Sequence, residues 1–340
     1  METTVSLTEL TVPPEWAPQT AIWTAWPANT KQWGGDLEPP RRDLAALARA
    51  LAPSNTVRVL ANGEEAEESA RASVGDVAEI VPARYGDVWL RDTGPIFARN
   101  ADGLVALRFE TNGWGGKFDL PDDHIVGDAI AGFARVPTRK FDFILEGGAI
   151  EQDGEGTIIT TRDVMLNANR NAWTERAAEA ALREAFAAEK IIWLDEGLRH
   201  DHTDGHIDNV ARFVEPGRVV CQTPSGPDDP NADILDAVAR ALEGATDAQG
   251  RKLEVIRIPS PGLVRGAPGE PVPASHMNFL IANGVVVMPA YGTPTQDAAR
   301  DALQSVFPNR TVIALNSRGL LGSGDVGGGS FHCSTLQEPL

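Results

Sequence analysis

The sequence predicts an α/β fold built from similar units of two strands, a helix and a third strand, closed radially around a central axis. Three observations predict it: apolar, β-rich runs recur in pairs around tight turns, helix-like stretches lie between the pairs, and another apolar run follows most of these stretches. The pairs recur at roughly 50 to 70 residues, which indicates structural repeats. Radial closure would remove the exposed edges of the sheets.

The paired runs have the composition of β-hairpins. Asp-Gly and Asn-Gly dipeptides between apolar runs favour tight hairpin turns. Four segments share this layout: residues 96–109 around Asp102-Gly103, residues 148–161 around positions 153–156, residues 210–223 around Pro216-Gly217, and residues 277–289 around Asn283-Gly284.

The stretches between the hairpins have helical periodicity. Leu44, Leu47, Ala48 and Leu51 show the three- and four-residue steps of a buried helix face best. The predicted helices are residues 41–52, 125–136, 171–187, 232–244 and 296–307. Buried strands are expected afterwards at residues 57–60, 190–194, 253–258 and 311–315.

The sequence predicts one domain, residues 1–340, because neither a linker nor a low-complexity stretch divides the chain. A two-domain, doubly wound fold is the competing interpretation, but it would need parallel strands without a hairpin at each step. The Pro- and Gly-rich residues 259–273 are expected to form a long loop and a candidate lid.

The net charge indicates which kinds of binding partner the protein suits, and the cysteine content indicates its compartment. A net charge of -18, from 48 acidic and 30 basic side chains, disfavours nucleic acid and suits a small cationic molecule, although surface acid also serves solubility. Neither a secretory signal nor an apolar stretch of membrane-spanning length is visible, so no membrane partner is expected. The 2 cysteines, Cys221 and Cys333, suggest no disulfide framework. We therefore expect a cytoplasmic protein. The sequence is compatible with either a monomer or a homodimer.

Cys333 is the candidate nucleophile. It follows Gly327, Gly328 and Gly329, and such glycines allow the backbone to approach a flat ligand closely. A lone cysteine is more often a small core residue, which is our interpretation of Cys221. The glycine run is no phosphate loop, because the Lys-Ser/Thr pair of that motif is missing.

Acidic and imidazole side chains supply the other candidates. If residues 206–208 are strand-like, His206 and Asp208 share one face, as a proton-transfer histidine beside a cation-binding carboxylate would. Asp92 is expected at the end of a strand before the rigid turn Gly94-Pro95, and Glu146 follows another apolar strand and precedes Gly147-Gly148. Each candidate belongs to a different unit, so radial closure would bring them together on the axis.

These residues resemble those of a known family, the agmatine deiminases and bacterial (Porphyromonas-type) peptidylarginine deiminases, which are guanidine-modifying enzymes. The resemblance covers nearly the whole chain, and the ordered set is specific although each piece alone is not. The matching segments are Val88-Trp-Leu-Arg-Asp-Thr-Gly-Pro95, Thr111-Asn-Gly-Trp-Gly115, Glu146-Gly-Gly148, Asp204-Gly-His-Ile-Asp-Asn209 and Gly327-Gly-Gly-Ser-Phe-His-Cys333.

The resemblance implies the pentein fold, a five-bladed α/β propeller that works without metal or organic cofactor. Its fifth unit would combine the strand at residues 21–26 with the C-terminal segment. It also implies the roles of the residues: Cys333 as nucleophile, His206 as general acid and base with Glu146 as its partner, Asp92 and Asp208 as the carboxylates that hold the guanidinium, and Trp89 and Trp114 as walls of the substrate channel.

The implied reaction is hydrolysis of agmatine to N-carbamoylputrescine and ammonia through a cysteine thiouronium intermediate, a step in putrescine and polyamine metabolism. Residues 330–337 and 315–325 depart from the usual family pattern, which leaves another guanidine, such as peptidyl-arginine, as an alternative substrate.

Two further interpretations stay open. His200, His202 and His206 resemble the ligand run of a zinc hydrolase, although Gly205 interrupts the required spacing. A polyamine-binding protein with a decayed site would bind the cation without releasing ammonia, but all five candidate catalytic residues are retained.

Overall fold

The computed structural model describes residues 10–118, 120–266, 269–322 and 327–340. Its strands are β1 (Gln19–Ala25), β2 (Thr56–Ala61), β3 (Glu79–Pro82), β4 (Ile96–Asn100), β5 (Gly103–Glu110), β6 (Thr138–Ile144), β7 (Ile150–Gln152), β8 (Thr157–Thr161), β9 (Lys190–Leu194), β10 (Ala211–Glu215), β11 (Arg218–Thr223), β12 (Glu254–Pro259), β13 (Leu280–Ile281), β14 (Val285–Ala290), β15 (Thr311–Asn316) and β16 (Thr335–Pro339).

The longer helices are α1 (Glu38–Leu51), α2 (Glu64–Val74), α5 (Asp123–Ala134), α7 (Glu175–Phe186), α8 (Ala232–Gly244) and α9 (Gln296–Val306). Short helical turns are η1 (Thr30–Trp33), α3 (Leu90–Thr93), α4 (Gly113–Gly116), η2 (Gly147–Ala149), α6 (Arg162–Met165), η3 (Ile207–Asn209) and α10 (Arg318–Leu321). No described helix is long and apolar enough to cross a bilayer.

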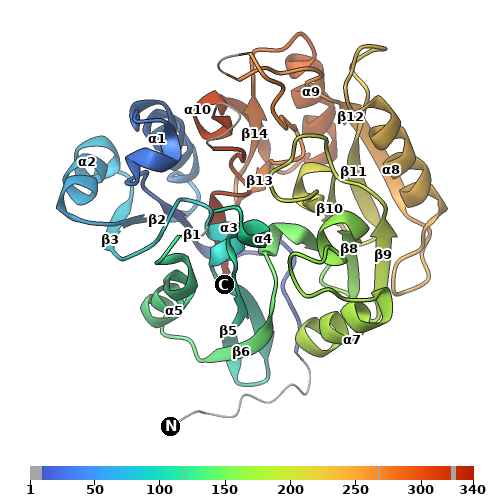
Figure 1. The fold of residues 1–340 in the computed structure, drawn as a ribbon, viewed down its shortest axis with the longest axis horizontal. Coiled ribbons are helices and arrows are strands. Elements are labelled where there is room, and N and C mark those ends of the chain that lie inside the picture. The colour runs from blue at the N-terminus through green and yellow to red at the C-terminus, as the bar shows by residue number, and fades with distance from the viewer. Residues whose placement is uncertain (1–9, 119, 267–268, 323–326) are drawn as a thin grey trace.

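Four of the five sheets formed by the described residues repeat one topology. In β4-β5-β6, β7-β8-β9, β10-β11-β12 and β13-β14-β15, an antiparallel hairpin comes first, and a parallel third strand follows a helix. All four predicted hairpins are therefore confirmed. The longer helices lie at the periphery, whereas the short helical turns α3 and α4 lie near the middle with the sheets (Figure 1).

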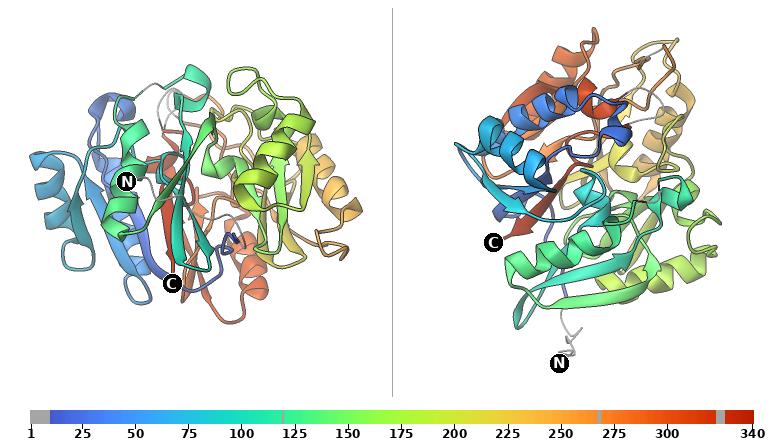
Figure 2. Two further views of the ribbon diagram at one scale, coloured as in Figure 1. Left: turned by 90° about the horizontal axis from the view of Figure 1, so that it is seen from below. Right: turned by 60° about the vertical axis from the view of Figure 1, so that its left-hand side comes forward.

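The fifth sheet, β16-β1-β2-β3, joins the two ends of the chain. Strand β16 pairs antiparallel with β1, with Trp23 opposite Leu336, and β1 pairs parallel with β2. This is the expected union of the N-terminal strand with the C-terminal segment. The views in Figure 2 show the last strand beside the first. Strand β3, which follows helix α2, extends this sheet beyond the predicted unit.

Local sequence explains where the helices begin. Helix α7 starts at Glu175 rather than near residue 171, because the side chain of Thr174 caps it by accepting a hydrogen bond from the amide of Ala177. Helix α1 has prolines in its first turn, where an amide hydrogen is not needed. Its Leu44, Leu47 and Leu51 are buried, as their spacing predicts.

Two predicted strands are wrong. Asp92 lies in the helical turn α3, and the segment after His206 forms the 3-10 turn η3 rather than a strand. Gly205 has φ of 93°, and the hydroxyl of Thr203 accepts a hydrogen bond from the amide of His206 at 3.1 Å. These local features turn the chain before β10 begins.

The loop at residues 259–273 carries a bridge between Arg265 and Pro271. Val264 and Val272 pack with Tyr291 and Leu321, and the described part of the loop does not line the cavity at Cys333. Its role as a lid stays a prediction. Of residues 315–325, positions 323–325 lie outside the described residues.

Candidate active site

The predicted catalytic residues lie together, and each precedes the edge strand that pairs antiparallel with the middle of its sheet. Asp92 comes before β4, Glu146 before β7, His206 and Asp208 before β10, and Cys333 before β16. Asn278 occupies the corresponding place before β13, so every sheet sends a polar side chain to the same centre.

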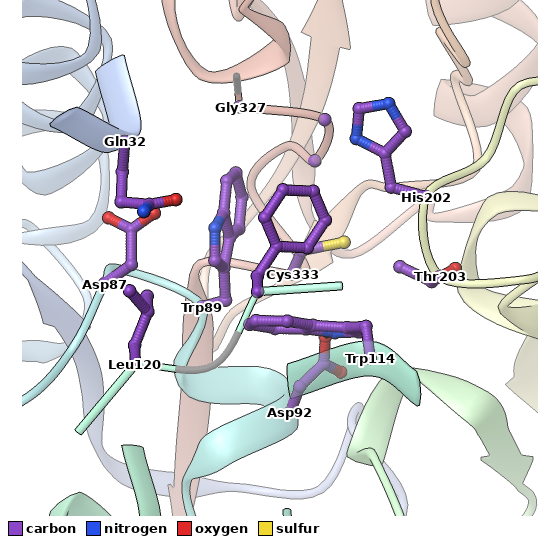
Figure 3. Close-up of a pocket in the computed structure, with 13 residues that line it drawn as sticks. Gln32, Asp87, Trp89, Asp92, Trp114, Leu120, His202, Thr203, Gly327 and Cys333 are labelled. Atoms are coloured by element: carbon purple, nitrogen blue, oxygen red, sulfur yellow. The ribbon is translucent and has the colours of Figure 1, made fainter. Parts of the chain in front are cut away.

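One cavity opens onto this centre (Figure 3). Asp92 and Cys333 reach its wall, whereas Glu146, His206 and Asp208 are buried and do not line it. The described residues that line it are Gln32, Asp87, Trp89, Asp92, Trp114, Phe118, Leu120, His202, Thr203, Gly327, Gly328, Gly329 and Cys333.

Cys333 is held by an amide and faces a carboxylate. Nδ2 of Asn278 donates to its Sγ at 2.9 Å, and Sγ lies 3.4 Å from Oδ2 of Asp208. Oδ1 of Asn278 accepts from the backbone amide of Cys333 at 3.2 Å. Burial, with the negative charges of Asp208 and Asp92, raises the pKa of the Cys333 thiol well above its ordinary value. The free protein therefore keeps this thiol protonated.

His206 lies between two carboxylates. Its Nδ1 is 3.7 Å from Oδ1 of Asp92, and its Nε2 is 3.7 Å from Oε2 of Glu146. Burial lowers the pKa of His206, but Asp92, Glu146 and Asp208 outweigh burial and raise the pKa to about 9. Neither ring nitrogen has a hydrogen-bond partner among the described residues. The site thus holds a protonated imidazole with free hydrogen-bonding capacity.

Glu146 is fixed by Arg170, a residue that sequence reasoning missed. Nε of Arg170 lies 3.1 Å from both carboxylate oxygens of Glu146, and its side chain also contacts Asp204. Burial raises the pKa of Glu146, but His206 and Arg170 outweigh it and leave the pKa below its usual value. Glu146 therefore stays ionised beside His206.

The two carboxylates predicted to hold a guanidinium differ in their partners. Asp92 accepts from Nε1 of Trp114 at 2.8 Å and from the amide of Gly148 at 2.9 Å. Oδ2 of Asp208 lies 2.8 Å from Nδ1 of His332, whereas its Oδ1 is buried without a partner among the described residues. That oxygen is free to accept a hydrogen bond from a ligand.

Burial dominates the pKa of Asp92 and raises it, although the charge of His206 opposes this effect. For Asp208, burial raises the pKa, but the hydrogen bond and charge of His332 outweigh burial and lower it. Asp208 is thus the more firmly ionised of the pair.

Glycine at position 148 is required by space. A Cβ there would lie 2.6 Å from Nδ1 of His206, 2.9 Å from Oδ1 of Asp92 and 3.1 Å from Oδ2 of Asp208. The same three contacts show how closely these side chains approach one another. Gly148 was part of the matched motif, but its spatial role was not visible in the sequence.

His332 and Glu15 form a support behind Asp208 that sequence reasoning also missed. The ring of His332 contacts Asp208 through Nδ1 and Glu15 Oε2 through Nε2, both at 2.8 Å. Glu15 also accepts from Nη2 of Arg212 at 2.7 Å. The position of His332 beside Cys333 was the only signal available for this group.

Trp89 and Trp114 lie in the cavity wall (Figure 3). The three histidines proposed for zinc do not converge. His206 faces Asp92 and Glu146, whereas His202 packs against Phe118 with ring centroids 5.8 Å apart, and His200 is exposed. Within the described part of the chain, no group of three His, Cys, Asp or Glu side chains is arranged to hold a metal ion.

Cys221 lies away from this centre. It is buried in β11 opposite Ala211, and burial raises the pKa of its thiol to about 12. This environment fits the predicted structural role.

Comparison with known proteins identifies relatives over nearly the full length. The agmatine deiminase of Pseudomonas fluorescens is 38% identical over 355 residues, covering 96% of this chain and 95% of that protein, and the Pseudomonas aeruginosa enzyme is 38% identical over 354 residues, with the same coverage. The structure of the Enterococcus faecalis agmatine deiminase superposes with a TM-score of 0.93 at 29% identity, covering 99% of each chain.

The fold is also shared at greater distance, since DDAH from Pseudomonas aeruginosa has a TM-score of 0.52 at 13% identity. The model of the Porphyromonas-type peptidyl-arginine deiminase family matches residues 11–339. A match across that span, together with the full-length relatives, shows that the chain belongs to the Porphyromonas-type peptidyl-arginine deiminase family.

Proposed function

We propose that the protein hydrolyses agmatine to N-carbamoylputrescine and ammonia. The observation that carries the proposal is a thiol, Cys333, beside two buried carboxylates, Asp92 and Asp208, at the base of an aromatic cavity. A guanidinium is planar and cationic, so carboxylates that accept from its nitrogens hold its carbon for attack. The names of the relatives support the same substrate.

The first half of the reaction forms a covalent adduct. The bound cation offsets the charges of Asp92 and Asp208 and so favours loss of the Cys333 proton to solvent water, and Sγ then bonds to the guanidinium carbon. The bond from that carbon to a terminal nitrogen breaks, and His206 gives its proton to the departing ammonia. The product of this half is a thiouronium on Cys333.

Hydrolysis of the adduct completes the reaction. His206, now neutral, takes a proton from water, whose oxygen bonds to the thiouronium carbon. The carbon–sulfur bond then breaks, which returns the electron pair to Cys333, and the remaining hydroxyl proton passes to this sulfur, leaving the neutral ureido product and the thiol. Glu146, held by Arg170, stabilises the protonated form of His206 in both halves.

The lining of the cavity favours agmatine over arginine. None of the described lining residues is lysine or arginine, so the α-carboxylate of arginine would meet no positive charge. The alternative substrate, another guanidine such as peptidyl-arginine, is tested by comparing kcat/KM for agmatine, arginine and a C-terminal arginyl peptide.

Ammonia release from agmatine tests the reaction directly. We expect Cys333→Ala to abolish it, because the substitution removes the thiol that forms the adduct. Cys221→Ala is the matched control and should retain turnover, since that thiol lies in β11. Unchanged activity in Cys333→Ala would exclude the covalent route.

We also propose that the five sheets are the blades of a pentein propeller within a single domain, residues 1–340. The contribution of every sheet to one centre supports this arrangement. The free thiols of Cys221 and Cys333 suit a reducing compartment, and we place the protein in the cytoplasm.

A further inference from the structure

A second carboxylate site faces the same cavity. Asp87 lines it together with Gln32, and Figure 3 shows the two side chains on one side of Trp89 and Cys333 on the other. The Asp87 side chain is buried, and its Oδ1 accepts from Nε1 of Trp33 at 3.0 Å. The cavity therefore has an acidic group at a distance from the reacting thiol.

Asp87 has no cationic partner among the described residues. No salt bridge joins it to any of the residues 10–118, 120–266, 269–322 or 327–340. Burial raises the pKa of Asp87 to about 7, even though the amide of Val88 and the indole of Trp33 lower it. A buried carboxylate without a counter-ion is unfavourable, so a cation entering the cavity would gain a partner that the protein leaves unpaired.

Trp89 provides an apolar surface between the two acidic ends. Its indole packs on Trp33 with ring centroids 5.8 Å apart, and its six-membered ring abuts Gly329, which also lies against Cys333. A Cβ at position 329 would lie 2.4 Å from that ring and 3.0 Å from Cβ of Cys333. A methylene chain can therefore follow the indole from the thiol towards Asp87.

We propose that Asp87 binds the terminal ammonium of agmatine and selects guanidines that carry a second cation at the far end of a short alkyl chain. The proposal rests on the proposed function. It places Asp92 in the cavity wall, with the buried Asp208, at the guanidinium end and Asp87 at the ammonium end. The same carboxylate would repel the carboxylate of free arginine.

The test compares agmatine with pentylguanidine, in which a methyl group replaces the ammonium. For the wild-type protein we expect kcat/KM to favour agmatine by about 10- to 100-fold, as charge-assisted hydrogen bonds do. In Asp87→Asn, which keeps an oxygen to accept from Trp33, the ratio of the two kcat/KM values should fall by about the same factor, mainly through KM for agmatine.

Asp36→Asn is the matched control, because it removes the same charge from an exposed residue and should leave the ratio as in the wild type. An unchanged ratio in Asp87→Asn would overturn the proposal. If that variant does not fold, equal kcat/KM for both compounds in the wild type would do so. Absence of ammonia from every guanidine would instead reject the proposed function.

Discussion

Oε2 of Glu15 accepts a hydrogen bond from Nε2 of His332 at 2.8 Å, although the two residues lie near opposite ends of the chain. Nδ1 of the same ring lies 2.8 Å from Oδ2 of Asp208. Because each ring nitrogen contacts a carboxylate, His332 is held between Glu15 and Asp208 and fixes the orientation of Asp208. The N-terminal segment thus supports the guanidinium site from behind.

Glu15→Gln should reduce both stability and activity. The substitution removes a buried charge that also pairs with Arg212, so we expect the free energy of unfolding to fall by about 3 to 5 kcal/mol. Loss of the support for Asp208 should lower kcat/KM by about 10-fold or more. Thermal denaturation and steady-state kinetics below the transition measure the two effects.

The exposed Glu68→Gln in α2 serves as the control for Glu15→Gln and should change neither quantity appreciably. If Glu15→Gln were less stable but as active as the wild type at a temperature where it is folded, the support would be structural only.

Asn278→Asp should slow the chemistry at Cys333 with little change in shape. The amide that donates to Sγ at 2.9 Å becomes a carboxylate, which adds a negative charge beside the thiol and raises its pKa further. We expect slower alkylation of Cys333 by iodoacetamide and a lower kcat. Alkylation as fast as in the wild type would show that Asn278 does not influence the thiol.

The pH profile should report the proton on His206. Since its pKa is about 9, the residue is protonated at neutral pH, and kcat/KM should be lost as pH rises through about 9. The free energy of unfolding should change with pH in the same direction. The stabilisation that comes from the raised pKa of His206 is complete below its unfolded-state pKa of about 6.5, and it is lost as pH rises through the folded-state pKa.

Initial rates from neutral to basic pH, with unfolding measured in parallel, test this assignment. His206→Gln should be far less active, and its residual activity should lack this basic limb. If the activity of His206→Gln also fell at the same basic pH, this part of the pH profile would belong to another group.

Gly148→Ala should abolish most activity, because the added Cβ would displace His206, Asp92 or Asp208. Displacement by about 1 Å can cost on the order of 100-fold in rate. Gly132→Ala in α5 is the matched control: nothing lies within 4 Å of its Cβ, and alanine should favour the helix. Comparable loss of activity in both variants would contradict the spatial argument.

Local signals in the sequence predicted most of the repeated units. Turns such as Asn283-Gly284 and the periodicity of α1 mark elements that form from neighbouring residues. Helix α2 was missed because its buried face consists of Ala66, Ala70 and Val74, which give a weak apolar pattern. The pairing of β1 with β16 was expected only through the family resemblance, because the strands are far apart in sequence.

The reactive side chains were easier to pick out from the sequence than the residues that hold them in position. Cys333 and His206 have side chains suited to few roles, and their motifs are specific. Glu15, Arg170 and Asn278 are common residue types whose importance comes from contacts with distant parts of the chain. His206 and Asp208 were predicted on a strand but lie at a turn, because the turn after Gly205 depends on local hydrogen bonds.

The pairing of β1 with β16 has a consequence for biosynthesis. Cys333 lies just before β16, so a ribosome adds the nucleophile after the residues that surround it. A nascent chain can form the hairpins from β4 to β14 and still lack the thiol and the strand that secures it to β1. Strands so far apart in sequence can pair only after a long loop has closed, and the entropy lost in that closure precedes the favourable contacts. We therefore expect the final assembly to be slow. Turnover would therefore begin only after the last strand has docked.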